Sequence, residues 1–247
     1  MVYNSEKVIP YNSSEPKTKQ VERMFNSIAS TYDKLNGILS LGIDNFWRRD
    51  AIKKLKPYHP QQILDVATGT GDFAILAQRI LSPNKIIGID ISEKMIERGK
   101  EKIEAKGLEN SITLKQQDCR AMNFPDNTFD AVTVAFGVRN FENIDQAFSE
   151  IRRVLKTNGI FLFLELSTPQ HFPMKQLYSM YSRFFIPFIG RLISSDKNAY
   201  QYLPQSISAF PQGEKMLNML EKNGFHILQY KTYTAGVCSL YIAQKRA

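Results

Sequence analysis

The chain is poor in residues that bind metals or form disulfides, with only two cysteines and three histidines among 247 residues. Cys119 and Cys238 are far apart and fit neither a disulfide framework nor the spacing of metal ligands. We therefore predict no metal site and favour a reducing, cytoplasmic compartment. His59, His171 and His226 fall in predicted loops or edges, so none of them is a good candidate for a general base.

Long apolar runs and dense basic runs are also absent. No stretch approaches the roughly 18–20 apolar residues that span a bilayer, and the N-terminus lacks the pattern of a signal peptide. The net charge is +8. The absence of a dense Lys/Arg run argues against a nucleic-acid partner. The charge fits either peripheral contact with the anionic inner face of the cytoplasmic membrane or a generally basic, solvated surface.

Hydrophobic residues make up 43% of the chain, which is enough for the core of one large α/β domain. Residues 1–20 are polar and aperiodic, so we expect a flexible N-terminal arm there. We expect a single domain over 21–247. Its predicted parts are a helical N-terminal segment, a cofactor-binding core, a lid or substrate insertion, and a terminal helix with a strand pair (21–60, 61–166, 167–211 and 212–247). The sequence leaves a homodimer open.

The central hundred residues alternate between apolar runs of strand length and helical patterns. The predicted strands are 62–67, 85–90, 112–117, 129–136 and 159–166, and the helices between them are 73–81, 92–106 and 143–155. This alternation indicates right-handed crossovers and a parallel sheet. Helices are also predicted at 17–32, 44–55 and 214–223, and the last two strands (225–233 and 237–243) form an antiparallel pair.

A glycine-rich turn, Gly69-Thr70-Gly71, joins the first predicted strand to a helix. Glycine lets the backbone approach a ligand closely, and a helix N-terminus offers free N–H donors. Asp90 ends the second strand, where an acidic side chain can accept both hydroxyls of a ribose. Together they predict a nucleoside-containing cofactor, and a purely structural turn beside a surface Asp is the weaker alternative.

The same turn fits the dinucleotide pattern G-x-G-x-x-G/A, so NAD is a second candidate. Asp65, four residues before the first glycine, would repel a pyrophosphate but could hold the ammonium of an amino-acid moiety. Asp118 and Cys119 follow the third strand, where an acidic side chain can meet an adenine amino group. Nothing downstream resembles a Tyr-Lys or His-Asp set for hydride transfer. These features favour S-adenosylmethionine over NAD.

Several longer segments carry a closer likeness. FNSIASTYDKLN (25–36), LDVATGTGDFA (64–74), NFPDNTFDAVTVAFGVRNF (123–141) and SDKNAYQYLPQSISAFPQGEKM (195–216) resemble the UbiE/MenG/COQ5 quinone C-methyltransferases. The likeness extends from about Glu22 to Lys245. Its FGVRN and YQYLPQSISAFP segments are more specific than the glycine turn, which many unrelated enzymes share.

The resemblance implies a class I S-adenosylmethionine-dependent methyltransferase fold, which is Rossmann-like. Its seven-stranded, mostly parallel sheet has the order 3-2-1-4-5-7-6 and an antiparallel last strand, with N-terminal helices and a helical lid insertion. It also implies C-methylation of demethylmenaquinol to menaquinol in menaquinone biosynthesis, with a lipophilic quinol as substrate. The family's cofactor positions map onto Thr70, Asp90, Asp118 and Cys119. Ala135 stands where some ubiquinone-pathway relatives have Ser.

The catalytic candidates are Arg139 and Asn140, at the carboxyl end of the fourth predicted strand, where ligands gather in open α/β sheets. A guanidinium lowers the pKa of a phenol by favouring its charged form, and an amide can orient the substrate or a water that accepts the proton. A structural salt bridge is the alternative for Arg139. Tyr32 and Asp33 are the next catalytic candidates and could close the pocket from the N-terminal helix, although core packing or helix capping explains them equally well.

The stretch 172–193 is aromatic and contains no acidic residue. We interpret it as a lid over a lipophilic tail, with Lys175, Arg183 and Arg191 available to lipid phosphates. A buried helical layer on the sheet is the alternative. Other functions also stay open: methylation of ubiquinone precursors or another lipophilic aromatic, and a non-enzymatic role in assembly or regulation. A nucleic-acid methyltransferase is disfavoured because no (D/N)PP(Y/F) segment follows the fourth strand.

Overall fold

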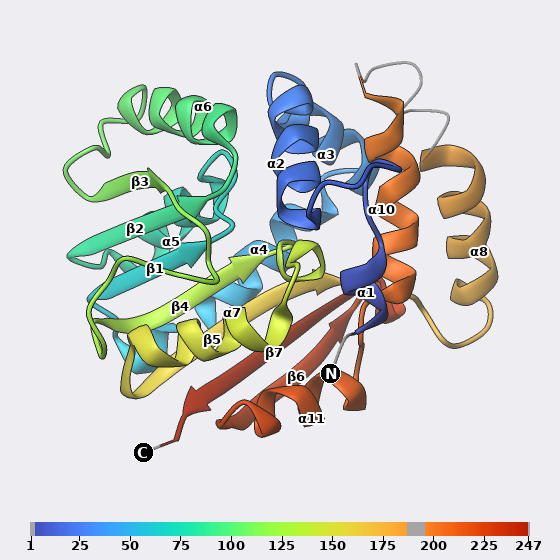
Figure 1. Cartoon of the computed structure of the whole chain (residues 1–247). Coiled ribbons are helices and arrows are strands. Elements are labelled where there is room, and N and C mark those ends of the chain that lie inside the picture. Colours follow the sequence, from blue (N-terminus) through green and yellow to red (C-terminus); the bar gives the residue numbers. More distant parts are fainter. Residues whose placement is uncertain (1–2, 187–195, 247) are drawn as a thin grey trace.

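A seven-stranded sheet is the centre of the protein (Figure 1). The computed structural model describes residues 3–186 and 196–246. The strands are β1 (Gln62–Val66), β2 (Lys85–Asp90), β3 (Ile112–Gln116), β4 (Phe129–Ala135), β5 (Leu155–Leu166), β6 (Phe225–Tyr233) and β7 (Cys238–Lys245). Their order is β3-β2-β1-β4-β5-β7-β6. The first five strands pair in parallel, and β7 runs antiparallel to both β5 and β6. This confirms the predicted order and antiparallel last strand.

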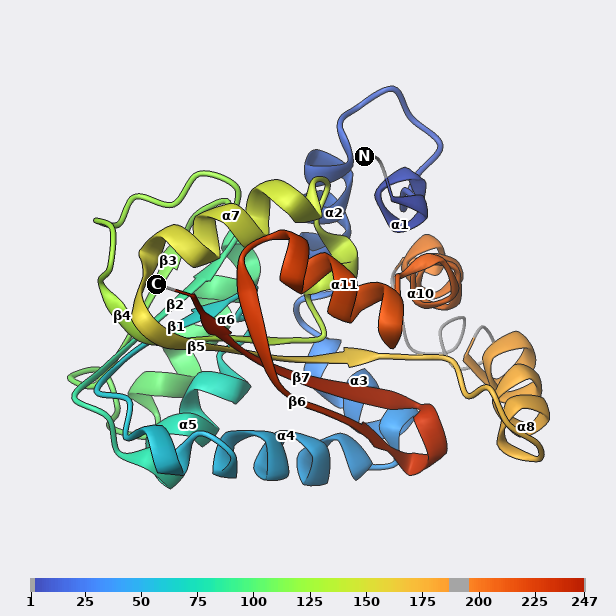
Figure 2. The ribbon, with the colours of Figure 1, turned by 90° about the horizontal axis from the view of Figure 1, so that it is seen from below.

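Helices cover both faces of the sheet (Figure 2). On one face lie α7 (Ile144–Val154) and α11 (Glu214–Lys222), and on the other lie α4 (Ile43–Lys53), α5 (Asp72–Leu81) and α6 (Glu93–Glu104). Each of these helices is amphipathic: α7, for example, buries Ile144, Phe148 and Ile151 at spacings of three to four residues. The core is therefore split into two apolar layers by the sheet.

A third group of helices stands at the carboxyl ends of the central strands (Figure 1). It contains α2 (Lys17–Ile28), α3 (Tyr32–Ser40), α8 (Met174–Met180), the π-helical turn η3 (Tyr181–Phe185) and α10 (Lys197–Ala209). The group has its own small core, in which Met24, Leu35 and Tyr202 are buried. Within the described residues, no helix combines the length and apolar character needed to cross a membrane.

Short elements complete the described chain: α1 (Asn4–Lys7), η1 (Lys56–Tyr58), η2 (Val138–Asn140) and η4 (Thr234–Gly236). Most predicted elements are found within about two residues of their expected bounds. Two differ more. β5 begins at Leu155 instead of Gly159, and the helix predicted over 17–32 ends at Ile28, with a new helix starting at Tyr32.

The described part of the expected flexible arm, from Tyr3 on, is instead packed against the domain. Ser5 is fully buried, and the Glu6 carboxylate accepts a hydrogen bond from the Ile144 N–H at 2.8 Å. The buried Lys17 ammonium donates to the Ser5 carbonyl oxygen at 2.6 Å. The prediction failed because polar contacts, which leave no apolar periodicity in the sequence, hold this segment in place.

Two helical glycines differ in their surroundings. A Cβ on Gly99 of α6 would clash with the Leu114 side chain and lie 3.2 Å from the Thr70 carbonyl carbon, whereas a Cβ on the exposed Gly37 of α3 would meet nothing within 4 Å. We predict that Gly99→Ala lowers the free energy of unfolding by about 1–3 kcal/mol through overpacking. Gly37→Ala should raise it by about 0.5–1 kcal/mol through helix propensity. Urea denaturation of both variants checks this, and equal effects would contradict the packing described.

Candidate active site

Three adjoining pockets lie at the carboxyl ends of β1, β2 and β4. The strand-end pocket, about 700 Å³, is lined by α2 and by the ends of these strands and of β3, including Asp90, Asp118 and Cys119. The turn pocket, about 320 Å³, is lined by the glycine turn with Asp65 and Arg48. The aromatic pocket, about 1010 Å³, lies among α3, α4, α8 and α10. Tyr32 lines all three, so it marks the point where they meet.

Asp90 organises the glycine turn. Its carboxylate accepts hydrogen bonds from the Gly69 N–H and the Ser92 N–H, both at 2.9 Å. Burial raises the pKa of Asp90, although these N–H donors act in the opposite direction. Asp90 and Gly69, both predicted to bind the cofactor, line the strand-end pocket. Gly71, by contrast, is absent from the described lining of the three pockets; its φ of 79° serves the start of α5.

Thr70 lines the turn pocket, but its hydroxyl is used within the protein. It donates to Asp33 Oδ1 at 2.7 Å and accepts from the Lys102 ammonium at 3.0 Å. Lys102 also pairs with Asp33 Oδ2 at 2.8 Å. The glycine turn is thereby tied to α3 and α6, and this fixes the position of the neighbouring Tyr32. Burial raises the pKa of the Tyr32 phenol.

Asp65 is 1% exposed at the edge of the turn pocket. Its two carboxylate oxygens accept hydrogen bonds from the hydroxyls of Thr68 and Thr133, each at 2.6 Å. Burial raises the pKa of Asp65 to about 6, and the two hydroxyls and the positive charge of Arg48 act against that rise. A carboxylate so placed is ionised at neutral pH and needs a cationic partner.

Asp118 and Cys119, predicted to lie near the adenine of the cofactor, both line the strand-end pocket. Burial raises the pKa of the Cys119 thiol strongly, so the thiol stays protonated. Burial acts to raise the pKa of Asp118 as well, but hydrogen bonds with Arg120 lower it overall. Arg120 Nη2 donates to Asp118 Oδ2 at 2.7 Å.

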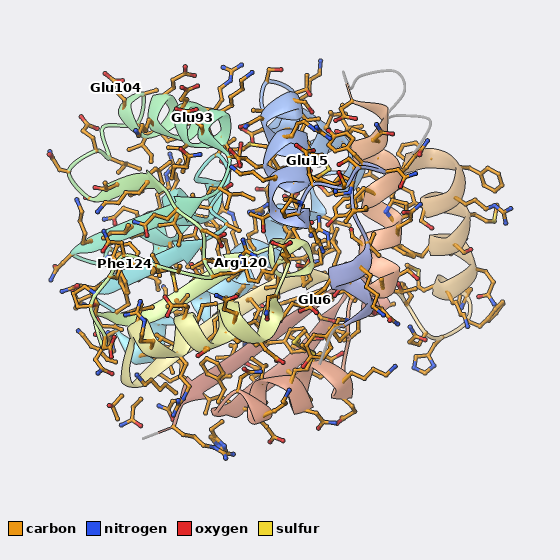
Figure 3. The ribbon with its side chains drawn as sticks, in the orientation of Figure 1. Glu6, Glu15, Glu93, Glu104, Arg120 and Phe124 are labelled. Carbon is orange, nitrogen blue, oxygen red and sulfur yellow. The ribbon has the colours of Figure 1, made fainter. Side chains whose placement is uncertain are left out.

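A chain of polar contacts connects this loop to α2. Arg120, labelled in Figure 3 beside the foot of α2, also pairs with Glu142. Glu142 in turn accepts a hydrogen bond from the Lys17 N–H at 3.1 Å and from the Thr18 hydroxyl at 2.6 Å. Because the first N–H groups of a helix lack partners within the helix, Glu142 caps α2 from outside. The contacts hold α2 over the strand-end pocket.

Arg139 and Asn140 lie side by side in η2, at the end of β4. Arg139 Nη1 is 2.6 Å from Glu165 Oε1, and the Arg139 N–H donates to Glu165 Oε2 at 3.0 Å. The structural salt bridge considered above therefore exists. Yet Arg139 also lines the aromatic pocket, and its buried Nε has no hydrogen-bond partner among the described residues. Asn140 lines both large pockets, and its Oδ1 accepts from the Tyr202 hydroxyl at 3.1 Å.

The aromatic pocket has walls that suit a flat, apolar group. Its walls are largely aromatic and aliphatic, and they include Trp47, Phe136, Tyr178, Tyr181 and Tyr202. Burial raises the pKa of Tyr178 and of Tyr181 to about 12, so these phenols are neutral at physiological pH. The Tyr181 hydroxyl donates to the Leu39 carbonyl, which joins η3 to the end of α3.

Sequence reasoning missed three side chains of this site: Arg48, Glu165 and Tyr202. Tyr202 falls in the segment 195–216, whose likeness to the family drew attention to the segment but not to that residue. Arg48 follows Trp47 on a correctly predicted helix, so amphipathicity was its available signal. Glu165 is an acidic residue within an otherwise apolar strand, and such a residue calls for a buried partner.

Comparison with known proteins agrees with this geometry. The model of the ubiE/COQ5 methyltransferase family matches residues 13–245. The chain belongs to this family. A demethylmenaquinone methyltransferase of Bacteroides fragilis is 54% identical over 245 residues, covering 99% of this chain and all of that protein. One from Porphyromonas gingivalis is 44% identical, covering 97% and 98%.

Solved structures bear out the fold. A SAM-dependent methyltransferase from Aquifex aeolicus superimposes with a TM-score of 0.53 at 20% identity, over 79% of this chain and 89% of that one. At that identity the likeness concerns the fold alone. Membership of the ubiE/COQ5 family makes the chain a methyltransferase and removes the dehydrogenase alternative that the glycine turn had raised.

Asp65 gives a pH-dependent prediction. A buried carboxyl with a raised pKa stabilises the folded state below its unfolded pKa, and this contribution is lost as the pH rises through about 6. We predict that the stability of the ligand-free Asp65→Asn variant relative to wild type grows by about 1 kcal/mol between pH 5 and pH 8. Urea unfolding at both pH values measures it. Glu109→Gln, at an exposed site, is the control, and the same trend in both variants would refute the assignment.

Proposed function

We propose that the protein transfers a methyl group from S-adenosylmethionine to a ring carbon of demethylmenaquinol, giving menaquinol. The observation that carries the proposal is the aromatic pocket, which adjoins the strand-end pocket and is lined by Arg139, whose buried Nε has no hydrogen-bond partner among the described residues. Family membership supports the reaction class. The names of the two full-length relatives support the substrate.

The strand-end pocket and the turn pocket have polar groups that suit separate parts of the proposed cofactor. Asp90 is an acceptor for ribose hydroxyls, and Asp118 and Cys119 border the space proposed for the adenine. Asp65 is an acceptor for an ammonium group in the turn pocket. Gly69 belongs to both pockets, while the Thr70 hydroxyl is already engaged by Asp33 and Lys102. When bound, the cofactor supplies an electrophilic methyl group on a sulfonium.

The chain's own residues would orient and activate the quinol ring. A ring in the aromatic pocket can place one oxygen beside the Arg139 guanidinium, which lowers the pKa of a phenol and stabilises the oxyanion. Glu165 fixes the guanidinium, and Asn140, held by Tyr202, orients the ring from the border of the two large pockets. The phenolic proton passes from that oxygen to water, and the ring carbon takes the methyl group as its bond to sulfur breaks. Loss of the proton on the methylated carbon and protonation of the oxygen then restore the aromatic quinol, so one proton is released overall. Tyr32 closes the junction of the pockets and keeps bulk water out.

The substrate is tested by supplying S-adenosylmethionine with a labelled methyl group. We predict label in the naphthoquinol of demethylmenaquinol and much less in ubiquinone precursors or phospholipid amines. Label found mainly in one of the last two would redirect the proposal to that substrate class. Tight S-adenosylmethionine binding without transfer to any quinol would favour the non-enzymatic alternative.

The role of Arg139 is tested by Arg139→Gln. We predict a loss of about 10²–10³-fold in kcat, the effect of removing a donor to a developing oxyanion, with unchanged affinity for S-adenosylhomocysteine. Because breaking a buried ion pair costs several kcal/mol, the thermal midpoint of the variant is measured first. Tyr202→Phe keeps the ion pair and removes only the hydroxyl that holds Asn140, so it should lower kcat by about 10-fold and cost about 1 kcal/mol of stability, less than breaking the ion pair. Near-normal turnover in both variants would exclude this mechanism.

We also propose peripheral contact between an anionic membrane and the outer side of the 172–186 segment. No residue of the described helix α8 is buried. Phe172, Leu177, Met180 and Phe184 are 81%, 56%, 62% and 66% exposed, which disfavours a buried helical layer over these residues. Lys175 and Arg183 supply positive charge. Arg191, also predicted to meet phosphates, lies outside the described residues.

Vesicle flotation tests the membrane contact. We predict that the protein floats with vesicles containing anionic phospholipid at low salt and binds them less at high salt, where charge is screened. Leu177→Ser with Phe184→Ser should abolish the binding. Leu228→Ser, at an exposed apolar site on β6, is the matched control. Absence of binding by the wild-type protein at low salt would refute the contact.

A further inference from the structure

The turn pocket is lined by side chains of opposite charge from distant parts of the sequence. Asp65 lines the pocket from β1, and Arg48 lines it from α4. Helix α4 lies beside α5 under the sheet (Figure 2). The Arg48 side chain is 12% exposed. A charged side chain that is this strongly desolvated requires partners for its donors.

The guanidinium of Arg48 is held in place but not saturated. Nε donates to Asp44 Oδ2 at 3.2 Å, and the group lies over the Phe136 ring, 4.9 Å from its centroid. A guanidinium has five N–H donors. Among the described residues, the Asp44 carboxylate is the single hydrogen-bond acceptor for the Arg48 guanidinium. Its planar fork suits a carboxylate, which it can bind through two parallel hydrogen bonds.

The charges of the turn pocket therefore match a zwitterion. Asp65 is the acceptor for an ammonium, and its pKa registers the positive charge of Arg48 nearby. The amino-acid end of S-adenosylmethionine carries both an ammonium and a carboxylate. Gly69 and Tyr32 lie between this pocket and the strand-end pocket, so one ligand can extend through both.

We infer that Arg48 binds the carboxylate of the cofactor's amino-acid end, which makes the N-terminal helix α4 a part of the cofactor site. The inference rests on the proposed function for the identity of the cofactor. It adds a binding residue that lies outside the glycine turn and the strand ends. It also assigns opposite partners to the two charged groups of the ligand, Asp65 to one and Arg48 to the other.

Equilibrium binding without quinol tests the inference, because no turnover is involved. Calorimetry compares S-adenosylmethionine with its decarboxylated form, which keeps the ammonium but lacks the carboxylate. For wild-type protein we expect decarboxylation to weaken binding about 10–100-fold, the range of charge-assisted hydrogen bonds. Arg48→Met should weaken S-adenosylmethionine by a similar factor and leave the decarboxylated form within about 3-fold. Arg48→Lys should retain an intermediate affinity.

Arg49→Met is the matched control, since Arg49 is the next residue on α4 and is exposed. It should change neither affinity. Equal weakening of both ligands by Arg48→Met would overturn the inference, since it would indicate a general structural defect. Unchanged binding of both ligands with a raised KM for the quinol would also overturn it and assign Arg48 to the aromatic pocket, which it borders as well. Failure of wild-type protein to bind S-adenosylmethionine would instead overturn the cofactor proposal, and this inference with it.

Discussion

The buried ion pair between Arg139 and Glu165 is the constraint on which the site depends. It joins the ends of the neighbouring parallel strands β4 and β5, and Glu165 binds both the side chain and the backbone N–H of Arg139. Removing two charges from water costs several kcal/mol each, which only good geometry and additional hydrogen bonds offset. Two well-packed aliphatic residues in place of the ion pair would stabilise the fold at least equally. The ion pair is useful because it holds a guanidinium rigidly in the wall of an apolar pocket while its Nε stays without a partner among the described residues.

Closure of the site depends on the N-terminal segment reaching the same strand ends. The Lys17 ammonium donates to the Arg139 carbonyl at 3.2 Å, while Glu142 caps α2 and Asn26 accepts a hydrogen bond from the Ser92 hydroxyl at 2.7 Å. Burial lowers the pKa of Lys17 to about 8, so holding its charge in the interior costs stability at neutral pH. The same polar contacts hold α2 over the strand-end pocket, which Thr18, Val21 and Phe25 line.

The sequence predicted the features that interactions between residues close in sequence control, such as helix caps and strand positions. Ser92 caps α6, and the strands follow from apolar runs that alternate with helices, whereas the strand order was implied by the resemblance to the family. Gly71, predicted to bind the cofactor, starts α5 and lies outside the lining of the three pockets. The order of the polar N-terminal segment was not predicted because it depends on partners more than a hundred residues away. Arg48 was missed for a related reason. On its own helix it is one basic residue among several, and only the folded chain brings it to Asp65.

The buried acids of the cofactor pockets show why the site and the stability of the fold oppose each other. Asp65 and Asp90 both have raised pKa values because they are desolvated, so each ionised carboxylate lowers the stability of the ligand-free protein near neutral pH. A ligand with an ammonium group removes part of that penalty at Asp65, so binding and deprotonation favour each other. Part of the binding free energy thus comes from relief of the desolvation penalty that Asp65 carries in the free protein. An uncharged pocket of the same shape would be more stable, but it would bind the zwitterionic end of the cofactor less tightly, and selection for function keeps the less stable arrangement.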